Sequence, residues 1–407
     1  MAFSSLLSTL VLALAVAASP VAIPRNNFVS LPIARRFNAT GTVNLLERDQ
    51  ARAAALKSNA QARLQGRAAS VAATNAADTY TVQVDIGSAG TSYTLLVDTG
   101  SSNTWVGASK AFVSSSSTVD TGDGVSVTYG SGSFSGTEYE DTVSLGNGLT
   151  ISSQSFGVAS TSSGFSGVDA DQVSSIGPVD LTEGTLSNSN AEIPTVTDNL
   201  YSQGVISEDL VAVSFEPTTS QSVTNGELTF GGTDSSKYTG SIAYTSLTST
   251  YPASYYWGID ESITYGTETI LSSTAGIVDT GTTLILIASN AYSKYESATG
   301  GTADANTGLL RITSTQYSNL KTLDFNIGGV TYGLTANAQI WPRALNTYIG
   351  GTSGDIYLVV NDIGTPSGEG LDFINGYTFL ERFYSVFDTG NSRVGFATTS
   401  YTAATTN

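Results

Sequence analysis

The sequence predicts an all-β body of two similar lobes, preceded by a basic leader that favours helix. Two observations predict this fold class. Residues beyond about Ser70 are rich in Ser, Thr, Gly, Tyr and Val, in short β-type runs separated by frequent turns. The tripeptide Asp-Thr-Gly also follows a buried-strand pattern twice, at Asp98 and at Asp279, 181 residues apart. An internal duplication with one copy in each lobe would leave such a repeat.

The N-terminus is predicted to be a secretory signal peptide over residues 1–18. Its apolar run, from Leu6 to Ala18, is too short to span a bilayer, and the small residues Ala15 and Ala17 suit cleavage nearby. A buried helix is the alternative interpretation. No later run approaches transmembrane length, so we expect a secreted, extracellular protein with no membrane partner.

The leader that follows, residues 19–70, differs from the body in composition and charge. Residues 44–66 are rich in Ala, Leu, Gln and Arg and favour helix. Eight basic and two acidic residues precede position 76, so 8 basic and 32 acidic residues remain beyond it, a formal net charge of −24. So acidic a body is not expected to bind nucleic acid, and it suits an acidic medium, where protonation reduces self-repulsion.

The opposite charges of leader and body suggest a role for the leader. Its arginines and Lys57 can pair with carboxylates of the body at neutral pH, and acid would weaken these pairs. We therefore predict that residues 19–70 are an inhibitory pro-segment, released at low pH by cleavage near residues 67–72.

The body contains neither His nor Cys, which excludes several reaction classes. Imidazole and thiolate metal ligands, Ser-His-Asp triads and Cys-His pairs are all impossible. Acid–base chemistry then depends mainly on Asp and Glu. No metal, cofactor or obligate partner is indicated, and we expect a monomer.

Asp-Thr-Gly occurs four times, and the flanking residues separate the four aspartates. Asp98 and Asp279 each follow three apolar or small residues and precede a hydroxyl residue by three positions. Asp120 follows a serine run and is expected in an exposed loop and turn. Asp388 lies between two β-type runs, which is a hairpin signal. Asp98 and Asp279 are therefore the predicted catalytic pair.

Several motifs, taken in order along the body, resemble the pepsin-like family of aspartic endopeptidases. They are "LLVDTGSSNTWVG", "VSVTYGSGSFSGTEYEDTV", "GELTFGGTDSSKYTGSIAY", "GIVDTGTTL" and "DFINGYTFLERFYSVFDTGNSRVGFA". The cysteine-free, Ser/Thr-rich character is most similar to secreted, polyporopepsin-type acid proteinases of basidiomycete fungi. The resemblance implies a bilobal pepsin-like fold of two β-barrel-like lobes, residues 71–247 and 248–407, with a cleft between them.

The resemblance also implies how the pair would act on polypeptide substrates. Two close carboxylates share one proton, because both cannot ionise cheaply, and the pair activates a water against the peptide bond. Such an enzyme would work at acidic pH and be pepstatin-sensitive. The dyad would be supported by residues that allow the turns, link the lobes or donate to the outer carboxylate oxygens, although generic turn composition is the alternative for the hydroxyls. These residues are Thr99, Gly100, Ser101, Thr280, Gly281 and Thr282.

A mobile hairpin, the flap, is implied by "VTYGSGSFSG", with Tyr129 at its tip and Gly130, Ser131 and Gly132 beside it. Trp105 would match the tryptophan that hydrogen-bonds this tyrosine. Because Ser131 lacks the charge that some fungal relatives carry there, we expect cleavage between bulky apolar residues. Leu96 and Ile277 are candidate pocket walls, with core packing as the alternative.

The sequence departs from the family pattern after Asp169, at residues 169–177. The family's Asp-Gly-apolar-apolar-Gly strand is replaced by polar residues, which are costly to bury unless they are hydrogen-bonded. The second half keeps a looser version at residues 374–376. A catalytically impaired pepsin-like binding protein is therefore the alternative to an active endopeptidase. A carboxylate-based glycosidase is a third alternative. It would need a pair of acids, but neither the duplicated Asp-Thr-Gly motifs nor the flap.

Overall fold

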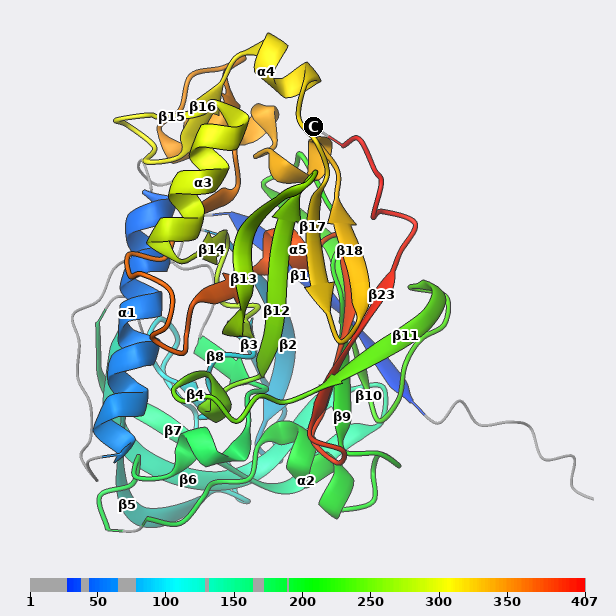
Figure 1. The fold of residues 1–407 in the computed structure, drawn as a ribbon. Coiled ribbons are helices and arrows are strands. Elements are labelled where there is room, and N and C mark those ends of the chain that lie inside the picture. Colours follow the sequence, from blue (N-terminus) through cyan, green and yellow to red (C-terminus); the bar gives the residue numbers. More distant parts are fainter. Residues whose placement is uncertain are drawn as a thin grey trace, which may run out of the picture.

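The computed structural model describes residues 28–37, 44–64, 78–128, 132–163, 172–188 and 190–406. The predicted signal peptide and the predicted cleavage region at residues 67–72 lie outside these ranges. The described chain forms two β-rich halves (Figure 1), so the predicted all-β, two-lobed fold is confirmed. Within these ranges, no helix combines the length and the apolar character needed to cross a membrane.

The largest sheet has 13 strands and joins the two halves. In spatial order its strands are β11 (Thr239–Ser246), β23 (Arg393–Thr398), β22 (Phe383–Asp388), β9 (Leu210–Ser214), β10 (Ser222–Phe230), β1 (Val29–Phe37), β2 (Asp78–Ile86), β3 (Thr91–Asp98), β8 (Gln172–Ser175), β4 (Trp105–Val106), β7 (Leu149–Ser163), β6 (Ser133–Gly146) and β5 (Val119–Thr128). The C-terminal hairpin β22–β23 therefore pairs with β9 and β11 of the first half. The lobe boundary at residues 247 and 248 stays a prediction.

The second half contains two further sheets, of seven and three strands. The seven-stranded sheet runs β18 (Val330–Leu334), β17 (Leu323–Ile327), β12 (Gly258–Tyr265), β13 (Glu268–Val278), β21 (Phe373–Asn375), β14 (Ile285–Ile287) and β20 (Val360–Asp362). The three-stranded sheet runs β15 (Thr302–Ala303), β16 (Leu310–Ile312) and β19 (Ile356–Tyr357).

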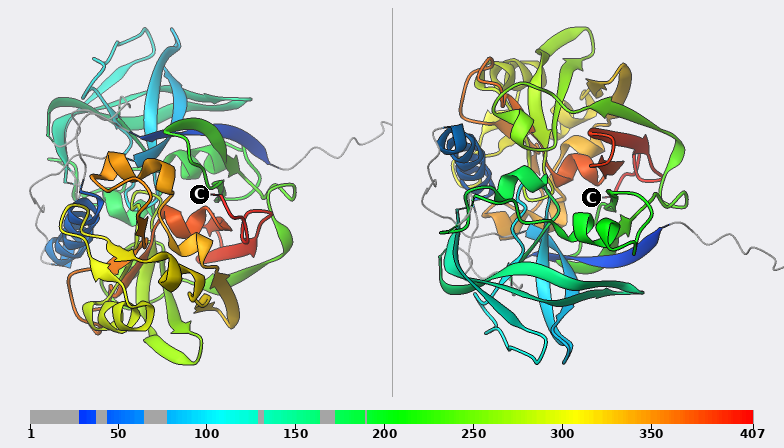
Figure 2. Two further views of the ribbon diagram at one scale, coloured as in Figure 1. Left: turned by 90° about the horizontal axis from the view of Figure 1, so that it is seen from above. Right: turned by 90° about the horizontal axis from the view of Figure 1, so that it is seen from below.

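Helices are short except for one in the leader. They are α1 (Leu45–Leu64), α2 (Val196–Ser202), α3 (Ser289–Thr299), α4 (Ser314–Ser318) and α5 (Tyr377–Leu380), with 3₁₀ helices at Val179–Thr182, Ala253–Tyr255, Asn337–Gln339 and Arg343–Ile349. The helix expected over residues 44–66 is thus present as α1. It lies along one side of the molecule, at the junction of the two halves (Figure 2).

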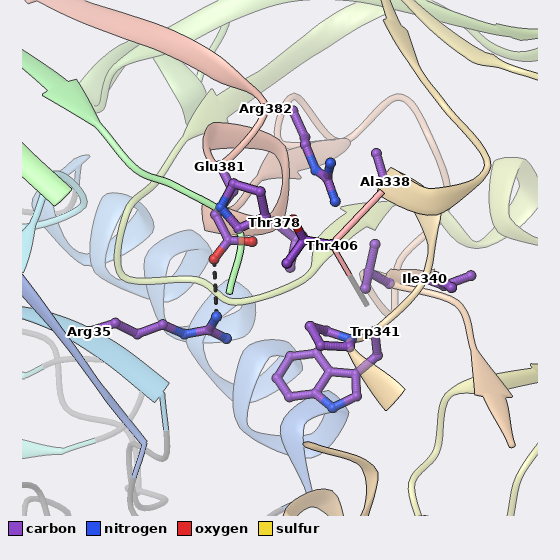
Figure 3. A pocket seen from close by; sticks show the side chains of 11 residues that line it. Arg35, Ala338, Ile340, Trp341, Thr378, Glu381, Arg382 and Thr406 are labelled. Atoms are coloured by element: carbon purple, nitrogen blue, oxygen red, sulfur yellow. Dashed lines mark hydrogen bonds and ion pairs between the residues drawn. The ribbon is translucent and has the colours of Figure 1, made fainter. Parts of the chain in front are cut away.

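The leader also contains a strand that the sequence analysis did not predict. Strand β1 pairs antiparallel with β10 on one side and with β2 on the other, so it completes the central sheet. Its buried Arg35 donates to the Glu381 carboxylate at 3.2 Å (Figure 3). It also donates to the Tyr377 hydroxyl at 3.1 Å. The predicted pro-segment is therefore a strand followed by a helix, rather than a helix alone.

A single large hydrophobic cluster holds both halves and the leader together. It includes Ile33 of β1 and Leu56 of α1 together with the strands of both halves. A smaller cluster at the turn-side end of the β5–β6 hairpin contains Leu96, Trp105 and Phe134, with the rings of Trp105 and Phe134 stacked 4.0 Å apart. The leader is thus part of the core in this state of the protein.

The two aspartates assigned to turns occupy different structures. Asp388 ends β22, and its carboxylate accepts from Arg393 Nε at 2.7 Å across the β22–β23 hairpin, as predicted for a corner. Asp120 was expected in a loop, and the structure corrects this. It lies exposed within β5, where the register against β6 shifts before Gly124. The Gly-rich sequence forms a bulge, and the strand continues through it.

Candidate active site

The two predicted catalytic aspartates lie at the ends of strands with the same surroundings. Asp98 ends β3, which runs parallel to β8, and Asp279 follows β13, which runs parallel to β21. The backbone N–H of Ile176 donates to the Asp98 carbonyl at 2.9 Å, and the N–H of Asp279 donates to the Asn375 carbonyl at 3.1 Å. Each aspartate is therefore held from behind by a second strand.

Two threonines link these loops by crossed hydrogen bonds. The N–H of Thr99 donates to Thr280 Oγ1 at 3.0 Å, and the N–H of Thr280 donates to Thr99 Oγ1 at 2.9 Å. Each hydroxyl in turn donates to a carbonyl of the opposite strand, at Val278 and Val97. These four bonds fix the two halves against each other at the aspartates.

Both carboxylates receive the same two bonds from their own loops. The Asp98 oxygens accept from the Gly100 N–H at 2.9 Å and from Ser101 Oγ at 2.6 Å. Those of Asp279 accept from the Gly281 N–H at 3.0 Å and from the Thr282 hydroxyl at 2.6 Å. Such bonds favour the ionised form of each acid.

The glycines of the two loops face the opposite carboxylates. A Cβ at Gly100 would lie 2.7 Å from Asp279 Oδ1, and a Cβ at Gly281 would lie 2.6 Å from Asp98 Oδ1. Both contacts are too close for any other residue. The glycines therefore let the two acids approach one another.

Arg52 of the leader helix occupies the space between the two acids. Its guanidinium donates to Asp98 Oδ1 at 2.6 Å, and to Asp279 Oδ2 and Oδ1 at 2.6 and 2.8 Å. The side chains of Arg52, Asp98 and Asp279 are 8%, 7% and 0% exposed. In the sequence, Arg52 is only one of eight leader cations. The available signal was its helical spacing of four residues from Arg48, which places both on one face.

The two acids differ in pKa in this state. Burial raises the pKa of Asp98, and the charge of Asp279 adds to this rise, against the opposing effect of Arg52. Burial acts on Asp279 too, but the charge and hydrogen bonds of Arg52, with those of Thr282 and Gly281, outweigh it and lower the pKa of Asp279.

Asp49, next to Arg48 on α1, anchors the helix beside the second catalytic loop. Its Oδ2 accepts from the N–H groups of Thr283 and Leu284 at 3.0 and 2.8 Å, and its Oδ1 accepts from Arg48 at 2.8 Å. Burial raises the pKa of Asp49, although Arg48 and the Leu284 N–H oppose the shift. In the sequence, Asp49 is one of only two leader acids, and its role was not predicted.

Strand β8 covers part of the segment that departs from the family pattern at residues 169–177. Strand β8 runs parallel to β3, with Asp98 in register with Ser175. Ser175 is fully buried, and its hydroxyl lies 2.9 Å from Ser101 Oγ and 2.8 Å from the Asn103 carbonyl oxygen. At Ser175 the buried polar side chain is thus hydrogen-bonded, so this position gives no reason to expect a catalytically impaired protein. Residues 164–171 lie outside the described chain.

The remaining predicted site residues are only partly described. Tyr129, Gly130 and Ser131, and with them the expected bond from Trp105 to Tyr129, lie outside the described residues, whereas Gly132 is described and buried. Leu96 belongs to the cluster at the turn-side end of the β5–β6 hairpin, and Ile277 is fully buried in the main core. In the described ranges, no cluster of three or more Asp or Glu has the arrangement of a metal site.

Comparisons with known proteins agree with this geometry. The family model for eukaryotic aspartyl proteases matches residues 79–399. Polyporopepsin from Irpex lacteus is 67% identical over 342 residues, which are 84% of this chain and 100% of that protein. Pepsin A from Suncus murinus is 33% identical over 290 residues, 70% of this chain and 68% of that one. The crystal structure of aspartic proteinase from Irpex lacteus has a TM-score of 0.80 and 59% identity, covering 93% of this chain and all of its own.

Proposed function

The chain belongs to the pepsin-like family of eukaryotic aspartyl proteases, and from this membership we propose that Asp98 and Asp279 form the catalytic pair of an acid endopeptidase made as a zymogen. The observation that carries the proposal is the mirrored bonding of two buried carboxyls, one from each half, around a single leader cation. The family membership itself makes the chain an aspartic endopeptidase.

Once Arg52 leaves, the chemistry follows from two facing acids. Their matched loop bonds favour ionisation of each, but two close negative charges repel, so the pair retains one proton. The ionised carboxyl of the pair removes a proton from a water held between Asp98 and Asp279. The protonated carboxyl donates to the carbonyl oxygen of the scissile peptide bond. The water oxygen attacks the carbonyl carbon, and the amine leaves after taking up a proton, with no covalent acyl-enzyme.

The leader, residues 19–70, is proposed to inhibit its own chain. Arg52 takes the place of the attacking water, and Asn59 Nδ2 donates to the Thr128 carbonyl at 2.7 Å, at the end of the β5–β6 hairpin. Acid would weaken this docking at two points: the catalytic pair gains a proton, and Asp49 loses the charge in its bonds to Thr283 and Leu284. Because burial raises the pKa of Asp49, that acid is protonated early as the pH falls.

Substrate preference is proposed to be for bulky apolar residues on both sides of the cut bond. The cluster of Leu96, Trp105 and Phe134 places apolar side chains at the turn-side end of the flap hairpin, where Phe134 pairs with Val127. The uncharged Ser131 gives no reason to favour a basic residue. A digest of a protein library in which cleavage after Lys dominates would contradict this preference. We further propose that the signal peptide at residues 1–18 directs secretion and that the protein is a monomer.

The proposal is tested by acidifying the purified full-length chain. We expect casein hydrolysis at pH 3–5 that pepstatin blocks and that falls by about 10²–10⁴-fold in Asp98→Asn and Asp279→Asn variants. Asp388→Asn is the matched control, because it removes a charge from the same tripeptide in a hairpin. Binding of casein without turnover supports the impaired alternative, and retained hydrolysis in Asp98→Asn refutes the catalytic pair.

A further inference from the structure

A buried acid and a buried amide meet behind the second catalytic loop. Glu261 on β12 and Asn375 at the end of β21 are 1% and 0% exposed. Asn375 Nδ2 donates to Glu261 Oε2 at 2.7 Å. The other two oxygens of this pair, Glu261 Oε1 and Asn375 Oδ1, are also buried and have no hydrogen-bond partner in the described chain.

Two buried acceptors without hydrogen bonds destabilise the fold. A single proton on Glu261 can give both of them a partner. If Glu261 is ionised, its Oε1 and the Asn375 Oδ1 are both acceptors and cannot bond to each other. If Glu261 is protonated, its O–H can donate to Asn375 Oδ1 while Oε2 still accepts from Nδ2. The two groups then form a closed acid–amide pair with every polar atom satisfied.

The electrostatic surroundings favour this protonated form. Burial raises the pKa of Glu261 to about 8, and the Asn375 hydrogen bond only partly opposes the shift. No neighbouring charge in the described chain adds to or opposes it. The charged residues on the strands packed around it are acidic: Asp260 on β12, Glu268 on β13 and Asp324 on β17. Beside these strands lie the acid Asp372, before β21, and the cation Lys321, whose ammonium lies over the Tyr265 ring. The cation after α5, Arg382, donates instead to Tyr401, Ala404 and Asn337.

The position of the pair connects it to the catalytic loop. Asn375 is in parallel register with Val278, and its carbonyl accepts the N–H of Asp279. The Asn375 side chain is therefore fixed by Glu261 while its backbone holds the catalytic aspartate. Any disturbance of the pair is transmitted through one residue to the Asp279 loop.

We propose that Glu261 is a positioning residue that acts as a neutral acid: it closes a hydrogen-bonded pair with the Asn375 amide, holds the strand behind Asp279, and loosens this loop when it ionises. The positioning role rests on the proposed catalytic role of Asp279, whereas the protonation of Glu261 does not. Because the pKa in the folded protein lies above the ordinary value, the pair is intact in acid. The contribution of the pair to folding stability therefore falls as the pH rises above the ordinary glutamate pKa, and it is lost once the pH passes about 8.

The test uses Glu261→Gln, which keeps the shape and supplies the same donor and acceptor without a titrating proton. After acid activation, we expect activity at pH 4 equal to wild type. The midpoint of irreversible inactivation on the alkaline side should rise by about one pH unit or more, since the ionising group is gone. Glu138→Gln is the matched control. It neutralises another buried glutamate, which accepts from Ser155 in the first half and does not contact the Asp279 loop.

A spectroscopic readout decides the protonation state independently of activity. Infrared difference spectra at pH 6.5 should show a protonated carboxyl band that is present in wild type and in Glu138→Gln, titrates near pH 8, and is absent in Glu261→Gln. If Glu261→Gln does not fold, Glu138→Gln still gives a decisive result: a carboxyl band that titrates near pH 8 supports the proposal. Absence of that band, or alkaline inactivation of Glu261→Gln at the wild-type pH, overturns it. Proteolysis retained in Asp279→Asn would instead refute the catalytic assignment and leave this band unaffected.

Discussion

Replacing Arg52 by Met in the full-length chain should release the proposed inhibition without acid. Methionine keeps the helix propensity of α1 and much of the length of the side chain. It removes the guanidinium that donates three hydrogen bonds to Asp98 and Asp279. The change therefore perturbs the contact between the leader and the catalytic pair and leaves the rest of the helix intact.

The magnitude follows from the burial of this contact. Removing one partner from a buried ion pair costs about 3–5 kcal/mol, because the remaining charges stay uncompensated. Asp98 and Asp279 can reduce this cost by sharing a proton, so we expect the lower end, about 3 kcal/mol. At about 1.4 kcal/mol for each factor of ten, the equilibrium for leader release should rise by roughly 100-fold.

Hydrolysis of a fluorogenic peptide at pH 6.5, before any acid step, measures this release. Arg52→Met should show pepstatin-sensitive activity where wild type shows almost none, while mass spectrometry confirms that the chain is intact. Arg52→Lys should be intermediate, because it keeps the charge and loses the planar fork. Lys57→Met is the matched control on the same helix. Its amine donates to the Thr365 hydroxyl and lies 3.8 Å from the half-exposed Glu369, an ion pair worth about 0–1 kcal/mol.

Two outcomes would refute this reasoning. The first is a folded Arg52→Met protein, with the melting behaviour of wild type, that remains as latent as wild type at pH 6.5. The second is equal activation by Lys57→Met, which would mean that loss of any leader cation suffices. Either result would show that the contact with the catalytic pair does not hold the leader in place.

Three further predictions concern the body. Asp98→Asn should lower peptide hydrolysis by about 10²–10⁴-fold, whereas Asp388→Asn should retain it and melt at a lower temperature, since the bond to Arg393 is lost. Ser175→Ala should reduce the free energy of unfolding by about 1–3 kcal/mol, because buried partners lose a hydroxyl, as measured by urea denaturation. Burial raises the pKa of Glu138 to about 7, so folding stability should fall as the pH rises from about 4.5 to 7. In Glu138→Gln, the loss of folding stability between these pH values should be smaller by about 3 kcal/mol, as measured by thermal melting. An unchanged dependence of stability on pH would contradict the raised pKa of Glu138.

Local sequence patterns were sufficient for the turns. The strand-to-turn frames at Asp98 and Asp279, with a hydroxyl three residues later, form carboxylate bonds that span only three positions. The hairpin at Asp388 likewise pairs residues five apart. Patterns of this range are decided by neighbouring residues, so the sequence alone could separate these aspartates from one another.

Elements whose partners lie far away in the chain could not be predicted from such local patterns. Strand β1 pairs with strands that lie beyond other elements of the chain, since helix α1 separates it from β2 and most of the first half separates it from β10. The strand at residues 172–175 was judged too polar, because the buried partners of Ser175 come from a segment about 70 residues away. Here tertiary hydrogen bonding overrides the local preference.

The amino-acid sequence by itself determined which acids could do chemistry: it supplies no imidazole or thiol, and it repeats one strand-turn frame in each half. Only the tertiary structure decided which of eight leader cations meets those acids. Arg52 is 46 residues from Asp98 and 227 from Asp279, and its position depends on how the helix docks against both halves. That docking is the sum of many distant contacts, which no short stretch of sequence encodes.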